Sequence, residues 1–401
     1  MNMAPISRRD TLALLGLGGT GLASGVLAAG IELPFANGAR ETTTAFPGKG
    51  EMILQRVRAP LLETPIAAMD GQVFTPNDRF FVRWHYDDIP TRVDTRSFRL
   101  RVGGAVRRPL AISLERFARL PRFAIAAVNQ CSGNSRGLFS PRVPGAQWGD
   151  GAIGNARWEG VRLRDVLDLA GVLPQAVAVR FAGLDRPPPG APPFAKALSL
   201  DHARDGEVMI ATHMNGEPLP LLNGLPMRLV VPGWYSTYWI KALDHIEVLT
   251  GPDDGYWMAK AYQIPATPDA GIAPGTHDFA KVPINRMVPR AFITLLADGA
   301  TVAADSPFYI RGLAMGGANA VARVDLSMDA GRSWHRATLG QDQGKYGFRL
   351  WEATIPGLKR GGYRLWARCT NADGDSQAMA PIWNPGGYMY APCPSIAIRA
   401  A

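Results

Sequence analysis

Residues with metal-binding or nucleophilic side chains are scarce in this sequence, which contains three cysteines and six histidines in 401 residues. No H-E-x-x-H pattern is present, so a zinc peptidase of that class is excluded. The usual nucleophile turn of an α/β-hydrolase, G-x-S-x-G, is missing as well. The absence of C-x-x-C-H excludes a covalently attached c-type haem on this chain.

Long apolar runs and clustered charges are also missing. Beyond residue 30, no segment is long and apolar enough to span a bilayer, so we expect no membrane anchor. The net charge of +9 is spread along the chain without a basic stripe, so nucleic acid is not an expected partner. Such a diffuse positive charge favours an anionic substrate or an acidic partner protein.

The first 30 residues have the pattern of an export signal. Arg8 and Arg9 precede a short, glycine-rich apolar run, which is typical of a twin-arginine (Tat) signal peptide. We therefore expect residues 1–30 to direct export by the Tat pathway and the mature protein to be periplasmic. An ordinary Sec signal is the alternative interpretation.

The length and turn content predict two domains built mainly from short strands. A chain of 401 residues exceeds the size at which one core keeps growing. The 33 prolines and 44 glycines, together with few stretches of helical period, favour strands and turns. The predicted class is α+β, with an irregular N-terminal arm over 31–75, a mixed catalytic domain over 76–270, a linker over 271–285 and an antiparallel β-sandwich over 286–401.

Two local predictions test this reading. The stretch "LRDVLDLAG" predicts a short amphipathic helix that ends at Gly171 as a C-terminal cap. In the second domain, "SMDAGRSW" predicts a hairpin whose Trp334 fills the sandwich core.

The three cysteines cannot all pair with one another. In an oxidising periplasm Cys369 and Cys393 could form a bridge; alternatively, Cys369 is a strand-core residue and Cys393 a tail residue. Cys131 lies in "NQCSGNSRGLF", near Gly133 and Arg136. A lone cysteine is commonly a core residue, but a thiolate is also a soft metal ligand, and a glycine allows close approach of the backbone.

Conspicuous cations occur in two further stretches. Arg83 and His85 are two residues apart in "FFVRWHYDDIP", so on a strand they would share a face. Arg228 and Lys241 flank a loop that begins at Pro232-Gly233 and that could bring both toward one anionic group.

Taken together, these stretches resemble the sulfite oxidase family of molybdenum enzymes. "CSGNSR" is similar to the family's C-x-G-N-x-R loop, and "NARWEGVRLRDVL" to its W-x-G-x-x-L segment. The run "MNGEPLP…GLPMRLVVPGWY…K" is similar to N-G-x-P-L-P…G-x-P-x-R…V-P-G…K. The C-terminal strands resemble the family's dimerisation domain, so the resemblance covers about residues 75–400.

The resemblance implies roles for individual residues. Cys131 would bind molybdenum directly. The pterin cofactor would be held by a second group: His85, Asp185, Asn223, Arg228, Trp239, Ile240 and Lys241. The substrate oxyanion would lie among a third group: Arg83, Arg136, Trp148 and Tyr262. The sequence departs from the family pattern at Trp84, Asn223 and Tyr238, and it has a leader and an arm where vertebrate members carry a b-type haem domain. These departures affect pterin contacts, substrate affinity and the electron route rather than metal ligation.

The activity implied by the resemblance is oxidation of sulfite to sulfate by oxygen-atom transfer at a molybdenum–molybdopterin centre. With no haem on this chain, the implied acceptor is a c-type cytochrome, bound either tightly as a subunit or transiently. The C-terminal domain implies a homodimer or docking of that cytochrome. Two alternatives are a periplasmic molybdenum-dependent sulfoxide (methionine sulfoxide) reductase and a cofactor-free binding or scaffold protein.

Overall fold

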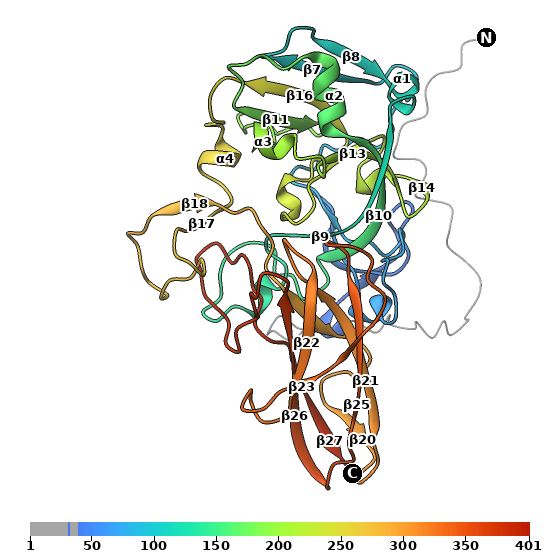
Figure 1. The fold of residues 1–401 in the computed structure, drawn as a ribbon, viewed down its shortest axis with the longest axis vertical. Helices are drawn as coiled ribbons and strands as arrows, with labels where there is room; N and C mark the ends of the chain where they lie inside the picture. The colour runs from blue at the N-terminus through green and yellow to red at the C-terminus, as the bar shows by residue number, and fades with distance from the viewer. Residues whose placement is uncertain (1–30, 33–38) are drawn as a thin grey trace, which may run out of the picture.

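The computed structural model describes residues 31–32 and 39–401, so the predicted export signal lies outside the described residues. Figure 1 shows two parts, one above the other: a mixed domain of sheets and short helices, and a sandwich of strands that ends at the C-terminus. No helix among the described residues is long and apolar enough to cross a membrane. The predicted α+β class, with a mixed domain followed by a β-sandwich, is confirmed.

The mixed domain is built around a long antiparallel pair of strands that extends toward the sandwich (Figure 1). Short strands extend this pair into a five-stranded sheet. Asn215 and Gly216, an Asn-Gly pair typical of two-residue hairpin turns, both have positive φ, and they join two of these strands. The sheet contains β9 (Arg122–Gln130), β10 (Ile153–Arg162), β13 (Met209–Met214), β14 (Glu217–Pro218) and β15 (Arg228–Val230).

A second sheet of the mixed domain has the order β12-β11-β16-β7-β8. Its pairs are antiparallel except β16 with β7, which are parallel. Apolar side chains alternate along these strands and pack into one core with the first sheet. The strands are β7 (Arg99–Gly104), β8 (Leu110–Ser113), β11 (Ala178–Gly183), β12 (Ala195–Ser199) and β16 (Leu243–Leu249).

The helices are short and lie at the ends of strands. The predicted helix is present as α2, and Gly171 caps it in the left-handed conformation with φ of 71°. The hydroxyls of Ser113 and Ser199 accept hydrogen bonds from the first turns of α1 and α3. The bounds are α1 (Leu114–Ala118), α2 (Leu163–Ala170), α3 (Leu200–Ala203) and α4 (Tyr256–Ala259).

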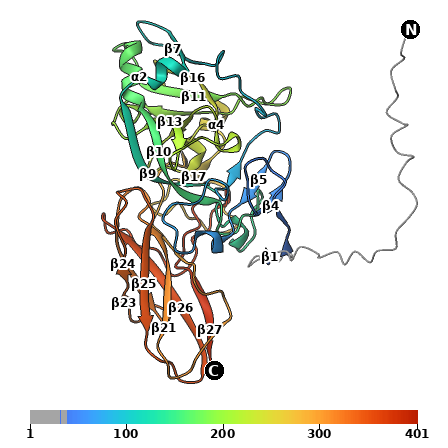
Figure 2. The ribbon, with the colours of Figure 1, turned by 90° about the vertical axis from the view of Figure 1, so that its right-hand side faces the viewer.

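The segment 31–75, predicted to be irregular, forms strands instead. β5 is buried throughout and β4 is buried at its first two residues, so neither shows the clear alternation of polarity that marks a half-buried strand, and the sequence pattern did not reveal them. They pair in the order β3-β4-β5-β6 and bring Arg83 beside the mixed domain, where Figure 2 shows β4 and β5. The strands within this segment are β1 (Ile31–Glu32), β2 (Ala39–Arg40), β3 (Thr42–Thr43), β4 (Met52–Arg56) and β5 (Leu61–Glu63), and β6 (Val82–Arg83) follows it.

The region between the domains is also more regular than predicted. Strand β17 (Gln263–Pro265) pairs with β18 (Lys281–Pro283), so a strand lies inside the predicted linker over 271–285. A shared apolar cluster, which includes Tyr235 and Ile284, joins the mixed domain to the first strands of the sandwich. The two domains therefore pack directly on each other.

The sandwich consists of two sheets with apolar side chains between them, seen edge-on in Figure 2. The sheet orders are β19-β21-β25-β24 and β20-β27-β26-β22-β23. The strands are β19 (Arg290–Ile293), β20 (Ala300–Val302), β21 (Phe308–Met315), β22 (Val321–Ser327), β23 (His335–Arg336), β24 (Thr338–Leu339), β25 (Arg349–Ile355), β26 (Gly361–Asn371) and β27 (Ser395–Ala400).

Two predictions for the sandwich have different outcomes. Trp334 does not fill the core: it is half-buried and lies under the guanidinium of Arg368, 3.8 Å from the ring centroid. The core tryptophan is Trp351, which is 1% exposed. Cys369 is a buried residue of β26, as the core interpretation predicted, and neither it nor Cys393 forms a disulfide.

Candidate active site

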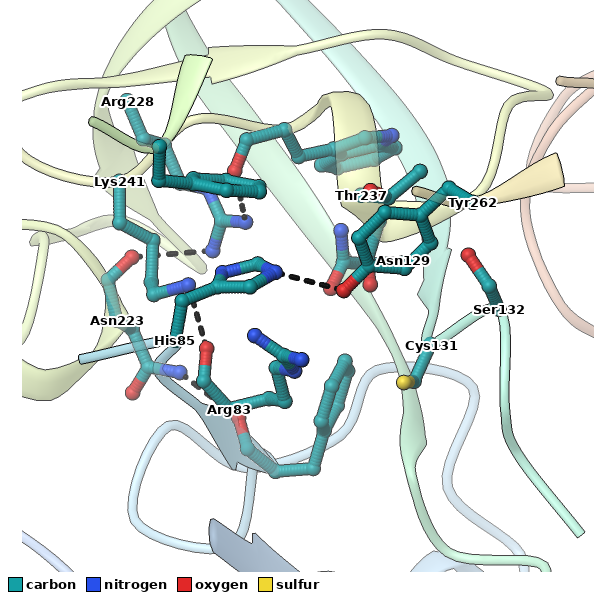
Figure 3. Close-up of a pocket in the computed structure, with 14 residues that line it drawn as sticks. Arg83, His85, Asn129, Cys131, Ser132, Asn223, Arg228, Thr237, Lys241 and Tyr262 are labelled. Atoms are coloured by element: carbon teal, nitrogen blue, oxygen red, sulfur yellow. Dashed lines mark hydrogen bonds between the residues drawn. The ribbon is translucent and has the colours of Figure 1, made fainter. Parts of the chain in front are cut away.

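Two adjoining cavities lie where the N-terminal strands meet the mixed domain. Arg83, His85, Cys131 and Tyr262 line both of them. Arg83 ends β6 and Cys131 follows β9, so strands from distant parts of the sequence bring the predicted residues together. Figure 3 shows the inner cavity, whose remaining lining residues are Phe81, Asn129, Ser132, Phe194, Asn223, Arg228, Ser236, Thr237, Trp239 and Lys241.

The loop that carries Cys131 is held by backbone hydrogen bonds. The amide of Cys131 donates to Ala152 O at 2.9 Å, and the amide of Ser135 donates to Gly149 O at 2.7 Å. Gly133 is needed for close packing, since a Cβ there would lie 2.5 Å from Cζ of Arg136. These hydrogen bonds and the close packing at Gly133 hold the backbone from which Cys131 and Arg136 project.

The inner cavity contains two buried cations. Arg228 donates from Nη1 to Asn223 O at 3.0 Å, and Lys241 donates from Nζ to Arg83 O at 2.7 Å (Figure 3). Burial lowers the pKa of Arg228 to about 9, so the guanidinium stays charged at neutral pH. Burial, together with the charge of Arg228, also lowers the pKa of Lys241. The described residues that line the inner cavity include no carboxylate, so two cations that face it favour an anionic group such as a phosphate.

His85 and Tyr262 meet across the boundary between the two cavities. His85 Nε2 and the Tyr262 hydroxyl are 2.6 Å apart, and the imidazole stacks on Phe194 with centroids 3.4 Å apart. Burial lowers the pKa of His85 well below its usual value, and the nearby cations lower it further. Burial raises the pKa of Tyr262. At neutral pH the pair is therefore an uncharged imidazole and an intact phenol that can donate a hydrogen bond.

The outer cavity has a volume of about 630 Å³ and opens toward solvent. Trp148, 1% exposed, forms part of its wall together with Arg83, Arg136 and Tyr262, the other residues that the resemblance assigned to the substrate. Arg136 contributes a cation, but its guanidinium is partly occupied, since Nε and Nη2 donate to Gly387 O and Gly386 O at 3.2 and 3.1 Å. Arg136 therefore contributes a positive charge at a fixed position rather than a guanidinium that is free to form two parallel hydrogen bonds with an oxyanion.

Two residues predicted to bind cofactor lie outside both cavity linings. Ile240 is a buried residue whose backbone bonds to Leu229 and Tyr238. Asp185 is buried after β11, and burial raises the pKa of its carboxyl, while the Lys241 ammonium opposes the shift. The tertiary structure thus places Asp185 as a neighbour of Lys241 rather than as a wall of the cavity.

Several lining residues were not predicted from the sequence. Asn129 Nδ2, Ser132 Oγ and Thr237 Oγ1 are buried without a hydrogen-bond partner, as are Arg83 Nη1 and Arg228 Nε. Their residue types are common in any sequence, so only the folded arrangement marks them. Unpaired buried polar atoms that converge on one cavity indicate a polar ligand, because leaving such atoms unsatisfied is costly.

Comparisons with known proteins agree with this site. Residues 86–257 match the family described as oxidoreductase molybdopterin binding domain, and residues 281–400 match the Mo-co oxidoreductase dimerisation domain. Sulfite oxidase of Gallus gallus is 34% identical over 384 residues, which cover 89% of this chain and 80% of that protein. Mitochondrial sulfite oxidase of Homo sapiens is 34% identical over 348 residues, covering 82% of this chain.

The chain spans 62% of the length of the human protein and 59% of that of the Drosophila melanogaster sulfite oxidase. Among solved structures, the sulfane dehydrogenase SoxCD from Paracoccus pantotrophus superposes with a TM-score of 0.74 at 24% identity, covering 90% of each chain. This likeness confirms the fold.

The fold and the site define a molybdopterin-binding oxidoreductase with a C-terminal dimerisation-type domain. More narrowly, the chain belongs to the sulfite oxidase family.

The residues present fit the molybdenum–pterin cofactor of this family. The free thiol of Cys131 is a soft ligand of the kind that molybdenum requires. Arg228 and Lys241 supply positive charge for a phosphate, and the unpaired donors of Asn129 and Ser132 suit a polar ring system. The donor chemistry of the inner cavity therefore suits the cofactor, with the thiol placed where the inner and outer cavities meet.

Proposed function

We propose that this protein oxidises sulfite to sulfate and passes the electrons to a c-type cytochrome. The observation that carries the proposal is the position of Cys131. It lines both the inner, cofactor-type cavity and the outer, solvent-facing cavity, beside the unpaired Nη1 of Arg83. The curated relatives that are sulfite oxidases support the same substrate.

Binding of the substrate anion is the first task of the chain's own residues. Arg83 offers an unpaired guanidinium nitrogen, and charge-assisted hydrogen bonds to an oxyanion are strong in a partly dry cavity. Arg136 adds positive charge from the opposite loop, and the Tyr262 phenol donates a hydrogen bond. Trp148 forms an apolar wall that excludes water from one side of the anion.

The inner residues hold the cofactor. Cys131 would ligate the metal, while Arg228 and Lys241 would hold the phosphate of the pterin. When bound, the molybdenum–pterin cofactor supplies the oxygen-atom transfer and takes up the two electrons. His85, kept uncharged by burial, stays available as a hydrogen-bonding partner on the cofactor side of Tyr262.

A cysteine pair provides the test. Cys131→Ser is expected to reduce sulfite-dependent reduction of oxidised cytochrome c to near background while the fold is retained. Cys369→Ser is the matched control, because Cys369 is also buried but lies in strand β26 of the sandwich. Turnover retained in Cys131→Ser, or turnover of methionine sulfoxide without turnover of sulfite by the unaltered protein, would contradict the proposal.

The assembly is part of the same proposal. The match of residues 281–400 to a dimerisation domain supports self-association through the sandwich, and the alternative is a heterodimer with a cytochrome subunit. Purification of the protein from its native host, followed by mass determination and a haem spectrum, separates the two. A homodimer without haem would favour a transient acceptor.

The last part of the proposal is that the protein is exported to the periplasm by the Tat pathway. Arg8 and Arg9 ahead of the apolar run support this route. Replacing both arginines with lysine is expected to abolish the periplasmic activity and leave the protein in the cytoplasm. An unchanged periplasmic fraction would argue for another route.

A further inference from the structure

A buried lysine lies directly behind the candidate active site. Lys196 belongs to β12 and is 0% exposed, although it lines neither cavity. Two residues earlier, Phe194 stacks on the His85 imidazole. Because alternate residues of an extended chain share a face, the stretch Phe194-Ala195-Lys196 presents both side chains toward the His85–Tyr262 pair.

The contacts of Lys196 leave its charge uncompensated. Nζ donates to Trp257 O at 2.7 Å and lies 4.6 Å from the ring centroid of Tyr238 and 5.5 Å from that of Tyr262. Asp253, the carboxylate whose charge acts on the lysine, is already paired with Arg180 at 2.8 Å. Keeping a lone ammonium in such a place is costly to stability, and such groups concentrate at functional sites.

Lys49, a second buried lysine, has the hydrogen bonds expected of a structural residue and serves as a comparison for Lys196. Lys49 is 8% exposed, and its Nζ donates to Asn77 O, Phe80 O and Asn223 Oδ1 at 2.8, 2.7 and 2.7 Å. All three of its donors have acceptors, whereas Lys196 has one acceptor and two aromatic faces. The hydrogen bonds of Lys49 are those of a structural residue, whereas the ammonium of Lys196 is left with few acceptors, as expected of a group that acts through its charge.

We propose that Lys196 is a positioning residue of the anion site: its ammonium, held by the Trp257 carbonyl behind Tyr262, supplies positive potential to the substrate anion. The inference rests on the proposed function in one respect, that the site binds a small oxyanion. Through Trp257, which lies in α4, the same ammonium also ties down the helix that precedes Tyr262.

The proposal has a pH signature. Burial lowers the pKa of Lys196 to about 7, so its charge changes near neutral pH in the anion-free protein. The groups that face it are the neutral phenols of Tyr238 and Tyr262, the uncharged His85 and the Asp253–Arg180 pair. An anion that binds favours the ammonium form, so anion affinity should fall as the pH rises through this range.

The experiment uses sulfate, which remains a dianion throughout, together with sulfite turnover. In Lys196→Met, the Kd of sulfate and the KM of sulfite are expected to rise roughly tenfold at about pH 6, with much smaller change in kcat. Above about pH 8.5 the difference from the unaltered protein should vanish, because Lys196 is then neutral. In Lys196→Gln, which keeps a donor for Trp257 O but no charge, sulfate should bind as weakly as in Lys196→Met.

Thermal stability gives a readout that does not depend on turnover. The Tm of Lys196→Met should equal or exceed that of the unaltered protein, since an uncompensated buried charge is removed. Lys49→Met, the matched control, should lower Tm, because three acceptors, two of them buried, lose their donor. Unchanged sulfate affinity in Lys196→Met, or affinity restored by Lys196→Gln, would overturn the role of the charge.

The outcomes also separate this inference from the proposed function. If the unaltered protein binds sulfate but does not oxidise sulfite, the proposed function fails, and the sulfate and Tm measurements still test Lys196. If sulfite is oxidised and sulfate affinity does not respond to Lys196→Met, only the inference fails.

Discussion

Glu63 connects the stability of this protein to the loop that presents Cys131. This carboxylate, 1% exposed at the end of β5, accepts hydrogen bonds from the amides of Gly149 and Gly151 at 3.1 and 3.0 Å. Gln55 Nε2 donates to it at 2.7 Å. Since Gly149 O in turn accepts from the amide of Ser135, Glu63 supports the Cys131 loop from behind.

The size of the effect of Glu63 on the free energy of unfolding follows from the pKa of its carboxyl group. Burial raises the pKa of Glu63 from 4.5 to about 7, against the opposing effect of its hydrogen bonds. Between those values the folded protein binds a proton that the unfolded chain does not, so this contribution to stability is complete below pH 4.5 and is lost as the pH rises through 7. A shift of this size corresponds to about 3 kcal/mol.

Glu63→Gln removes the titration. The difference in free energy of unfolding between this variant and the unaltered protein should change by about 3 kcal/mol from roughly pH 4.5 to roughly pH 8, with the unaltered protein losing stability relative to the variant. For a chain of this length that is about 4 °C in Tm, measured by calorimetry at both pH values. Glu115→Gln, an exposed acid with 77% of its side chain accessible, should show no such change. A pH-independent difference for Glu63→Gln would refute the reasoning.

Three further substitutions test the site and the fold. Arg83→Gln should raise the KM for sulfite roughly tenfold with little change in kcat, since it removes the unpaired guanidinium; an unaltered KM would exclude Arg83 from anion binding. Lys241→Met should reduce the molybdenum and pterin content of the purified protein, measured by metal analysis, because the inner cavity loses a cation; full cofactor content would contradict its role. Gly171→Ala should cost about 1 kcal/mol and leave turnover unchanged, because the residue has φ of 71°; an unshifted Tm would show that the cap is not needed.

The local patterns predicted well where short-range rules apply. The helix that ends at Gly171 and the turn at Asn215-Gly216 depend on backbone preferences of a few residues, so they could be predicted without the fold. The position of the Trp334 ring could not be predicted in this way, because the same hairpin pattern is compatible with a ring in the core or on the surface. In the structure the ring lies at the surface, where the guanidinium of Arg368 covers it.

The strands of the N-terminal segment show a different limit. β5 is buried along its whole length and β4 at Met52 and Ile53, and a strand that is covered on both faces lacks the alternation that marks a half-buried one. From its residue type alone, Glu63 would be expected to lie exposed at the surface. It is buried because Gly149 and Gly151 offer it amide donors from a loop 86 and 88 residues away.

The sequence by itself determined the candidate chemistry of this protein: one cysteine in a glycine-containing loop, an arginine and a histidine two residues apart, and an arginine and a lysine around a turn. The residue types alone left Cys131 open between a core residue and a metal ligand; the roles could be assigned because these stretches, in their order along the chain, resemble the motifs of the sulfite oxidase family. Only the tertiary structure decided which neighbours complete the site, among them Lys196, Asn129 and Thr237. Their role depends on burial and on unpaired polar atoms, and these arise only when distant strands pack together.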